Sequence, residues 1–473
     1  MNSSSQSQFH AQFAVASRSM GVKLLLVCGL ALLMLIPALL VFGLVGERKP
    51  READVMQQIS AQVGGRQSFL GPVLAIPYTE VPQQPGAATR QGLYLVFPAQ
   101  ASAAVNTATQ QRRRSLFKVP VFQANLKFNA SFDLAGVPNA APENAVLDWN
   151  HAEIVVGVSD PRGALSDAQL TANGTTTTLA PSTAAPDLVL GGGRSPQLRL
   201  VMFGAPFGNI AKPNAKFDVQ STLHFSGAQR IAILAYGKTT QVTMQGDWPS
   251  PGFDGGFLPL HQTVTPHGFT AQWSVPYIAR GVAAEGSASS IHGLAGTALG
   301  VSFVEVANPY QSVTRSLKYV PLFLGLVFLT YFIFEATTGK RVHPAQYVLV
   351  GVAQIIFYLL LLSFSERIGF SLGFLIAGAA TVILLSTNAG WIFASRLQGL
   401  RALGIFSGLY LLIYLLLRLK DNALMVGALA SFAAVAAAMY FTRGINWYSS
   451  LPGRTSDTAL PSSPTTNHSE NEG

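Results

Sequence analysis

Apolar residues are concentrated in one segment near the start of the chain and in a block that begins near residue 319. A helix needs about 20 mostly apolar residues to cross a bilayer. Segments that reach or approach this length predict six transmembrane helices, at Val22–Val45, Tyr319–Phe334, Tyr347–Phe364, Phe370–Thr387, Leu403–Leu417 and Ala423–Phe441. The first is expected to be a single anchor helix, and the other five are expected to form a C-terminal bundle.

Between the first two apolar segments, apolar residues recur with a period of two. In Leu126–Leu134 every second residue is apolar, and Phe217 and Val219 repeat this spacing. Such alternation is typical of strands with one buried face. Gly, Pro and Asn separate the runs, which predicts an antiparallel sandwich or a barrel-like fold. A short helix is expected near Glu52–Val63 and an exposed loop at Thr171–Ala185.

The predicted fold class is an integral membrane α-helical protein with a large β-rich domain inserted between transmembrane helices 1 and 2. The expected order is a disordered N-terminal segment (1–21), the anchor helix (22–45), the β-rich domain (46–317), the five-helix bundle (318–441) and a mostly disordered tail (442–473). The two tails are rich in Ser, Gln, Thr and Asn and have few apolar residues, which favours disorder.

The first apolar segment could be taken for a signal peptide, because Arg18 and Lys23 precede or open it. However, it exceeds the usual apolar region of about 7–15 residues, and no A-x-A site follows it, so we expect an uncleaved anchor. Lys and Arg near the short loops favour a cytoplasmic N-terminus and a cytoplasmic C-terminus. The β-rich domain is then predicted to be periplasmic, in the inner membrane of a bacterium with two membranes.

The composition agrees with a membrane protein. Charged residues make up 11% of the chain, whereas average usage is about 25%. The formal charge of +9 does not indicate nucleic-acid binding, because the segment from Glu47 to Arg315 has 19 Lys/Arg against 16 Asp/Glu. The one cysteine, Cys28, lies in the first apolar segment, which excludes an intrachain disulfide and a cysteine-based metal site.

Several stretches are recognisable together and in order. They are Leu70–Pro77, Gln111–Arg114, Phe132–Leu134, Gly246–Pro251, Gly256–Pro259, Phe269–Trp273, Arg315–Tyr319, His343–Tyr347, Ser365–Phe370 and Asn446–Tyr448. From about residue 20 to 450 this set resembles the CreD family of inner-membrane proteins, the cell-envelope integrity proteins. The resemblance implies a periplasmic domain, a role in envelope integrity, and control by a two-component envelope-stress system linked to colicin tolerance and the β-lactam response. It implies no established biochemical activity and no agreed active-site residues.

The run Arg112, Arg113 and Arg114 is the candidate ligand contact in the exported domain. Arginine pairs bidentately with phosphate and carboxylate, so these residues could contact lipid headgroups, lipopolysaccharide or peptidoglycan precursors. The alternative is a solvated loop that precedes a strand.

Gly369, Ser371 and Gly373 satisfy the G-x-S-x-G pattern of a hydrolase nucleophile elbow. That elbow requires a strand before the serine, whereas here the motif opens a predicted transmembrane helix. We expect Gly369 and Gly373 to form a small-residue packing face instead, as Gly404 and Gly408 do in the next helix.

Other polar residues give weaker signals. His261, His267 and His292 share one loop-rich region, but their spacing is not typical of a metal site, so separate surface or packing roles are expected. Charged residues are sparse inside the predicted spans, where Glu335 lies at an end and Gln354 is mid-span. A transport pathway usually requires more intramembrane charge.

The sequence therefore predicts a non-enzymatic protein of envelope integrity and the stress response, with no cofactor and no metal. Its β-rich domain would bind an envelope protein, lipopolysaccharide, a peptidoglycan-related partner or another lipid-like ligand, while the helices contact membrane lipids. The alternative is a lipid or small-solute transporter that uses the C-terminal bundle. A membrane-embedded hydrolase ranks last, and the oligomeric state is left open.

Overall fold

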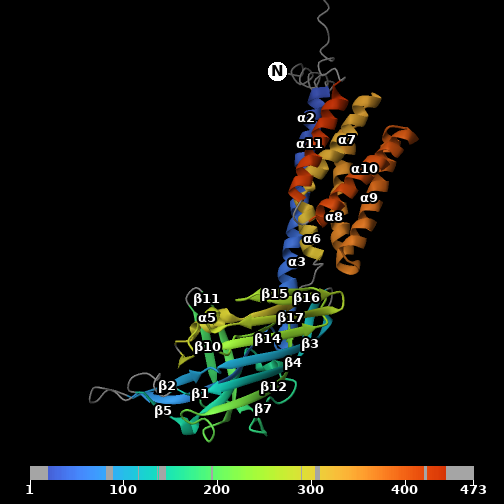
Figure 1. Cartoon of the computed structure of the whole chain (residues 1–473). Coiled ribbons are helices and arrows are strands. Elements are labelled where there is room, and N and C mark those ends of the chain that lie inside the picture. Colours follow the sequence, from blue (N-terminus) through green and yellow to red (C-terminus); the bar gives the residue numbers. More distant parts are fainter. Residues whose placement is uncertain are drawn as a thin grey trace, which may run out of the picture. The chain divides into compact units, whose positions relative to one another are not determined.

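The structure is a computed structural model that describes residues 20–80, 89–114, 117–135, 137, 145–192, 195–288, 290–303, 309–419 and 423–443. The tails predicted at 1–21 and 442–473, and the stretch Asn446–Tyr448, lie almost wholly outside these residues. The chain divides into two compact units (Figure 1). Unit 1 comprises Met1–Gly46 and Pro309–Gly473, and unit 2 comprises Glu47–Asn308.

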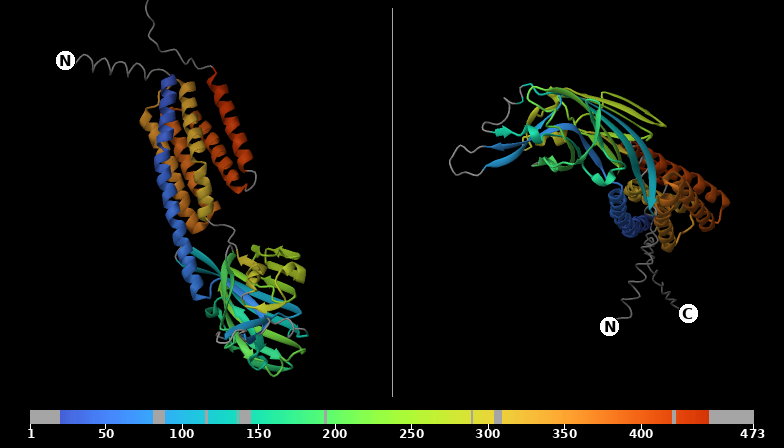
Figure 2. Two further views of the ribbon diagram at one scale, coloured as in Figure 1. Left: turned by 90° about the vertical axis from the view of Figure 1, so that its left-hand side faces the viewer. Right: turned by 90° about the horizontal axis from the view of Figure 1, so that it is seen from below.

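Unit 1 is built from apolar helices, which run alongside one another in Figure 2. The long helices of the chain are α2 (Met20–Leu33), α3 (Leu35–Gln62, which continues into unit 2), α6 (Pro309–Lys318), α7 (Val320–Thr338), α8 (Pro344–Ile368), α9 (Phe370–Ile392), α10 (Arg396–Arg418) and α11 (Ala423–Thr442). Among the described residues, five helical segments are long and apolar enough to cross a membrane: 21–62, 320–338, 344–368, 370–392 and 396–418. The sixth predicted span corresponds to a shorter apolar helix, Met425–Tyr440.

Local sequence explains where α7 ends and α8 begins. Gly339 follows α7 in the left-handed conformation, with φ of 68°, which costs glycine little. Pro344 occupies the first turn of α8, where its fixed φ suits a helix and its missing N–H is not needed. The His343 side chain accepts a hydrogen bond from the N–H of Ala345, so the start of α8 is capped.

Unit 2 contains two β-sheets. In the described residues one sheet has eight strands, in the order β16-β17-β14-β3-β4-β12-β7-β8. Their bounds are β16 (His261–Thr265), β17 (Gly268–Val275), β14 (Thr239–Gly246), β3 (Gln100–Arg114), β4 (Phe117–Asp133), β12 (Lys216–Ala228), β7 (Gln169–Ala172) and β8 (Thr175–Thr178). Neighbouring strands are antiparallel except β14 and β3, which run parallel.

The second sheet has eleven strands within the described ranges. Its main order is β10-β11-β6-β1-β13-β19-β15, and β2, β5, β9 and β18 pair beside this path. The bounds are β10 (Asp187–Gly192), β11 (Ser195–Pro206), β6 (Glu153–Val158), β1 (Gln67–Glu80), β13 (Arg230–Ile233), β19 (Leu299–Phe303), β15 (Pro251–Gly255), β2 (Arg90–Val96), β5 (Ala145–Leu147), β9 (Ala180–Pro181) and β18 (Glu285–Ser287). Strands β1 and β13 are parallel.

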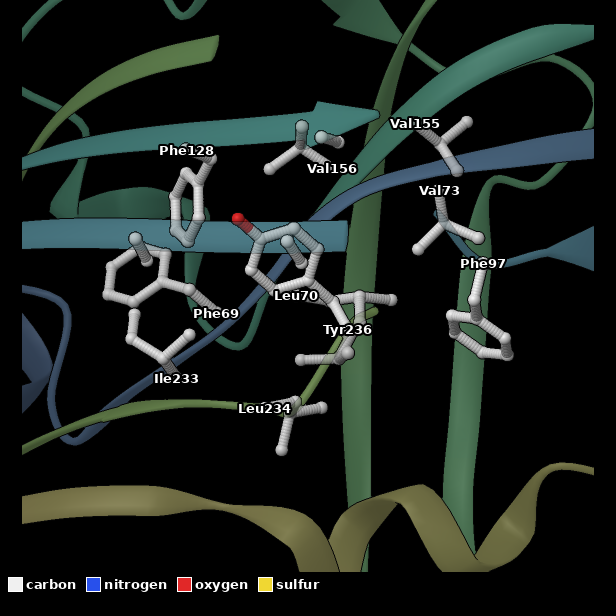
Figure 3. Close-up of a cluster of buried hydrophobic side chains, with 14 of the residues drawn as sticks. Phe69, Leu70, Val73, Phe97, Phe128, Val155, Val156, Ile233, Leu234 and Tyr236 are labelled. Atoms are coloured by element: carbon white, nitrogen blue, oxygen red, sulfur yellow. The ribbon is translucent and has the colours of Figure 1, made fainter. Parts of the chain in front are cut away.

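Both sheets contribute to one hydrophobic core. Phe69 of β1 meets Phe225 of β12 edge to face, with ring centroids 5.3 Å apart. Phe128 of β4 meets Tyr236 in the same way at 5.6 Å, and Figure 3 shows the Tyr236 ring beside Phe128. The β-rich character predicted from alternation is therefore confirmed, and the two parallel strand pairs are an addition that alternation alone did not predict.

Tyr236 also joins the core to backbone groups of the eight-stranded sheet. Its ring is fully buried, and its hydroxyl lies 2.7 Å from the carbonyl oxygen of Ser102 and 2.9 Å from that of Asn129. Gly71 of β1 leaves the space for this ring, because a Cβ there would lie 2.6 Å from ring carbons of Tyr236. The glycine and the tyrosine thus form one packing unit.

The structure contains the predicted short helix and differs from the prediction at one loop. The helix expected near Glu52–Val63 is present as the end of α3. The loop expected at Thr171–Ala185 is wrong in part, because Thr175–Thr178 forms β8 and pairs with Gln169–Ala172 of β7. β8 is nevertheless fully exposed. Threonine suits strands because its branched side chain fits a pleated surface, although four identical residues give no alternation to detect.

Candidate functional site

The solvent-facing side of the eight-stranded sheet carries an array of neutral polar side chains, here called the polar face. Successive residues of a strand point to opposite sides, so Leu126 and Phe128 of β4 are buried while Asn125 and Asn129 are exposed. The polar face consists of Thr270, Gln272, Ser274, Gln241, Thr243, Gln245, Ser102, Asn106, Gln110, Gln123, Asn125, Asn129, Ser131, Gln220, Thr222 and His224.

Strand register arranges these side chains in rows across the sheet. Gln245 of β14 lies opposite Asn106 of β3, Asn106 lies opposite Asn125 of β4, and Asn125 lies opposite His224 of β12. Neighbouring strands are about 4.8 Å apart, so each row presents a polar group at that interval. The Gln245 amide donates to the Asn106 side-chain oxygen, which aligns the two amides.

The polar face carries little net charge. Lys127 and Asp218 are exposed within its area and have opposite charges. At its margin Lys216 and Asp133 lie opposite each other, with Nζ 2.8 Å from Oδ2. The hydrogen bond from Lys216 lowers the pKa of the Asp133 carboxyl, and the opposite charges of this pair add no net charge to the margin of the polar face. The array therefore offers mainly uncharged donors and acceptors.

The same side of the sheet is apolar and covered where α3 ends. Ile59 and Val63 pack there against Val119 and Val121 of β4 and Ala228 of β12. Burial of these side chains is favourable at about 25 cal/mol per Å² of apolar surface. The last turns of α3 and the sheet are thus held together within unit 2, and the polar face begins beyond this contact.

The predicted arginine run lies at the end of the β3–β4 hairpin. Strand pairing continues to the last residue of β3, with Arg113 opposite Lys118 and Arg114 opposite Phe117. The alternative of a loop before the strand is therefore wrong, because the run itself forms strand. Arg112 and Lys118 are exposed, whereas the side chains of Arg113 and Arg114 lie outside the described residues. Basic residues are concentrated at one end of the sheet, beside neutral ones.

Unit 1 contains a buried charged cluster at one end of the helices. The Glu335 carboxylate of α7 is 2% exposed and contacts the Lys23 ammonium of α2. It also accepts hydrogen bonds from the Val342 N–H at 3.0 Å and from the Tyr347 hydroxyl at 3.1 Å. Lys23 donates to the Val342 carbonyl at 2.9 Å. Four interactions thus satisfy the buried carboxylate and the part-buried ammonium, and they connect α2, α7 and α8.

A second buried polar cluster lies near the middle of the helices. Gln354 and Tyr358 are one helical turn apart on α8, and they lie buried with Thr381 of α9 and Tyr410 of α10. Both amide atoms of Gln354 and the hydroxyls of Tyr358 and Tyr410 have no hydrogen-bond partner of good geometry among the described residues. Tyr410 is close enough to Gln354 and Thr381 for electrostatic interaction. Gln354, the polar residue predicted at mid-span, is therefore one of several polar groups at this depth.

The candidate packing glycines occupy different environments. A Cβ on Gly373 would lie 2.8 Å from the backbone nitrogen of Ser365 in α8, so α8 and α9 approach closely there. A Cβ on Gly404 or Gly408 would meet nothing within 4 Å among the described residues. Gly369 separates α8 from α9 with φ of 86°, and its role is to turn the chain.

Close approach of α9 and α10 depends on two other glycines. A Cβ on Gly399 would lie 3.3 Å from the Cα of Gly390. Gly404 instead lines a groove of about 680 Å³ between α7, α10 and α11, with Arg401 and Gln398 among its lining residues. Some small residues of these helices, such as Gly390 and Gly399, therefore allow close helix contact, whereas Gly404 lines an open groove.

The histidines and the G-x-S-x-G motif singled out in the sequence can be placed within the described ranges. No group of three or more His, Cys, Asp or Glu side chains there could hold a metal ion. His261 lies in β16 and His292 opens a short 3-10 helix. Ser371 lies in the first turn of α9, and its hydroxyl accepts from the Arg418 guanidinium at 3.1 Å. This residue follows a helix, whereas a nucleophile elbow follows a strand.

Sequence comparison identifies the family. The family described as "Inner membrane protein CreD" matches residues 19–448. The inner membrane protein CreD of Escherichia coli (strain K12) is 31% identical over 436 residues, which cover 90% of this chain and 93% of that protein. The chain belongs to the CreD family. As a CreD-family member with several membrane-length apolar helices, it is a multi-pass inner-membrane protein.

Sequence reasoning missed the two polar clusters of this CreD-family protein for different reasons. Lys23 and Glu335 were assigned to helix flanks, although one acid and one base among so few intramembrane charges could have suggested a pair. Tyr358 and Tyr410 lie within the apolar runs of the predicted spans and were not singled out. The spacing of Gln354 and Tyr358 by four residues was the signal that they share a helix face.

Proposed function

We propose that the protein contributes to cell-envelope integrity and the envelope-stress response by binding a partner through its β-rich domain. In this proposal α11 is the sixth transmembrane span, both termini are cytoplasmic, and unit 2 is periplasmic. The domain would bind an envelope glycan, such as the sugar portion of peptidoglycan or lipopolysaccharide. The protein would have no catalytic activity.

The observation that supports this proposal is the polar face. Its Asn, Gln, Ser and Thr side chains supply both donors and acceptors, and the absence of strong net charge favours a partner that is neutral and rich in hydroxyl and amide groups. Sugars have this chemistry. A broad, ordered array suits an extended polymer because many neutral hydrogen bonds of about 1 kcal/mol each can act together.

The arginine run adds a second kind of contact. Arg112, Arg113 and Arg114 could pair with phosphate or carboxylate groups carried by the same polymer. Such contacts weaken as salt is added, whereas neutral hydrogen bonds do not depend on charge screening. Salt dependence therefore separates the contribution of the arginine run from that of the polar face.

The test is co-sedimentation of the purified full-length protein, in detergent, with insoluble peptidoglycan sacculi. The variant Asn106→Ala/Asn125→Ala/Gln245→Ala removes one row of exposed amides, and we expect it to bind roughly tenfold or more weakly. The matched control is Gln91→Ala/Asn150→Ala/Gln197→Ala, which removes exposed amides from outside the polar face. Equal binding by the two triple variants would refute a role for the polar face.

Lipopolysaccharide provides the second arm of the same test. Arg112→Gln/Arg113→Gln/Arg114→Gln should weaken binding to lipopolysaccharide at low salt and have little effect at high salt. If the protein binds neither sacculi nor lipopolysaccharide, the glycan proposal fails, and a protein partner becomes the occupant to seek.

The second candidate function is lipid or small-solute transport by the helix bundle. The buried cluster of Gln354, Tyr358 and Tyr410 favours it, because unsatisfied polar groups deep in a membrane helix bundle are costly and usually serve a function. A deletion strain would be complemented with the full chain and with a chain that ends after unit 2, and survival in detergent and β-lactam would be scored. Full protection by the stable truncated chain eliminates transport. No protection by it places the function in the bundle.

A further inference from the structure

A groove follows the contact between α9 and α10 in unit 1. Its volume is about 580 Å³, and its walls include Ser371, Leu375, Ala379 and Ile383 of α9 and Ser407 and Tyr414 of α10. Most of the remaining lining residues are apolar, and the groove is open along one side. Both helices are among the segments long and apolar enough to cross a membrane, so this groove lies where lipid chains surround the protein.

The length of the groove matches one leaflet of a bilayer. From Ser371 to Ile383 the α9 axis advances ~18 Å, at 1.5 Å per residue. Half of a hydrocarbon core of about 30 Å is about 15 Å. The groove therefore begins near one end of the two helices and continues to about mid-membrane, the length that one acyl chain occupies.

A cationic group lies at the outer end of this groove. The Arg418 guanidinium, in the last turn of α10, donates through Nη2 to the Ser371 hydroxyl at 3.1 Å and to the Tyr414 hydroxyl at 3.0 Å. Its Nε also donates to Tyr414 at 3.2 Å. These bonds fix the guanidinium beside two residues that line the groove. Arg418 is exposed, and within the described residues its Nη1 donors have no acceptor and its charge has no carboxylate partner.

We propose that the α9–α10 groove is a binding site for an anionic phospholipid. One acyl chain lies along the apolar groove, and the phosphate receives hydrogen bonds from Arg418 with Ser371 beside it. Arginine suits phosphate because its planar donors match two phosphate oxygens. The apolar wall with the Arg418 cation at its end complements an amphipathic anion better than it complements a free anion or an uncharged hydrocarbon. This site is independent of the role proposed for the β-rich domain.

Lipid binding in the groove can be tested by filling the groove from one of two neighbouring alanine positions. Ala379 lines the groove, whereas Ala380 is also exposed on α9 but does not line it. Purified full-length protein would be titrated with dioleoyl phosphatidylglycerol in detergent, and bound lipid would be counted by native mass spectrometry. Ala379→Trp should lower occupancy of the tightest site roughly tenfold or more, and Ala380→Trp should retain wild-type occupancy. Ser407→Phe closes the same groove from α10 and serves if Ala379→Trp does not fold.

The headgroup contact is tested with a pair of arginines. Arg418→Gln should weaken phosphatidylglycerol binding roughly tenfold, because a charge-assisted hydrogen bond is lost. It should also abolish the preference for this lipid over dioleoyl phosphatidylcholine. Arg367→Gln removes an exposed charge from the C-terminal end of α8. It should change neither the affinity for phosphatidylglycerol nor the preference for this lipid over phosphatidylcholine. Equal occupancy in the two tryptophan variants, or an unchanged lipid preference in Arg418→Gln, would overturn the proposal.

Discussion

The ammonium group of Lys23 in α2 contacts the buried carboxylate of Glu335 in α7, although 312 residues separate them in the sequence. Unit 1 therefore includes the N-terminal helix as well as the C-terminal ones, and the anchor helix contributes a packing contact. Tyr347 and the backbone of Val342 complete the environment of the carboxylate.

Removal of one member of this pair should be more damaging than removal of both. Glu335→Gln leaves the Lys23 charge without its carboxylate, a change that typically costs about 3–5 kcal/mol when a pair is buried. Lys23→Met/Glu335→Gln should be more stable than the sum of the two single changes predicts. Thermal unfolding of the detergent-solubilised protein measures this, with the exposed Arg341→Gln as control. Strictly additive single effects would show that the pair is not coupled.

Gln67 of β1 should be one of the least replaceable polar residues of unit 2. It is fully buried, donates to the carbonyls of Gly64 and Asp160 at 2.9 Å each, and accepts from the Ser159 hydroxyl at 3.1 Å. Gln67→Met keeps the volume but leaves these groups unpaired, so we expect a loss of at least about 2 kcal/mol. The exposed Gln91→Met should change stability by less than about 0.5 kcal/mol. Similar losses in both variants would contradict the prediction.

Gly71→Ala should destabilise unit 2 through the ring of Tyr236. The added methyl would lie 2.6 Å from ring carbons, and such overpacking costs about 1–3 kcal/mol. Gly296→Ala is the matched control, because a Cβ there would meet nothing within 4 Å. Chemical denaturation followed by tryptophan fluorescence measures the stability of both variants. Equal denaturation midpoints for Gly71→Ala and Gly296→Ala would show that the core accommodates the extra methyl group without loss of stability.

Asp160 should stabilise unit 2 at neutral pH and cease to do so in acid. Its carboxylate accepts from the Arg162 side chain at 2.9 and 2.6 Å and from the Arg162 N–H at 3.0 Å, which lowers its pKa below the ordinary 3.8. A carboxyl group with a depressed pKa in the folded state stabilises it above the unfolded pKa, and that stabilisation is lost as pH falls through the folded pKa.

Asp160→Asn keeps a capping side chain but removes the charge that pairs with the exposed Arg162, so it should cost about 0.2–1 kcal/mol at pH 7. The difference in melting temperature between variant and wild type should shrink as pH falls below about 4. A difference that stays constant between pH 7 and pH 3 would show that the charge of Asp160 contributes nothing.

The sequence predicted those features that depend on local periodicity. Alternation from Leu126 to Leu134 placed the buried and exposed sides of β4 correctly, and apolar length located the long helices. Features that require register between distant segments were not predictable. The row from Gln245 to His224 depends on the pairing of four strands, one of them parallel to its neighbour.

In the candidate site, too, local features were predictable from the sequence and features that depend on distant segments were not. The arginine run was visible because three charges are adjacent in the sequence, but whether it formed a loop or a strand depended on the pairing of Arg114 with Phe117. Exposure of Gly404 and the close approach of Gly390 and Gly399 depend on which helices are neighbours. A glycine pattern indicates only that two helices could approach closely. Whether they do depends on which helix lies against the glycines in the folded protein.

The parallel pairing of β1 with β13 has a consequence for the timing of biosynthesis. Gln67 pairs with Ile231, so the first strand of unit 2 must wait for its neighbour while the chain between them is made. At ~5–20 residues per second this takes roughly 10–30 s. During that interval the edge of an apolar strand is open to wrong partners. The pairing of β1 can therefore be completed only after the chain has been made as far as Ile231 to Ile233.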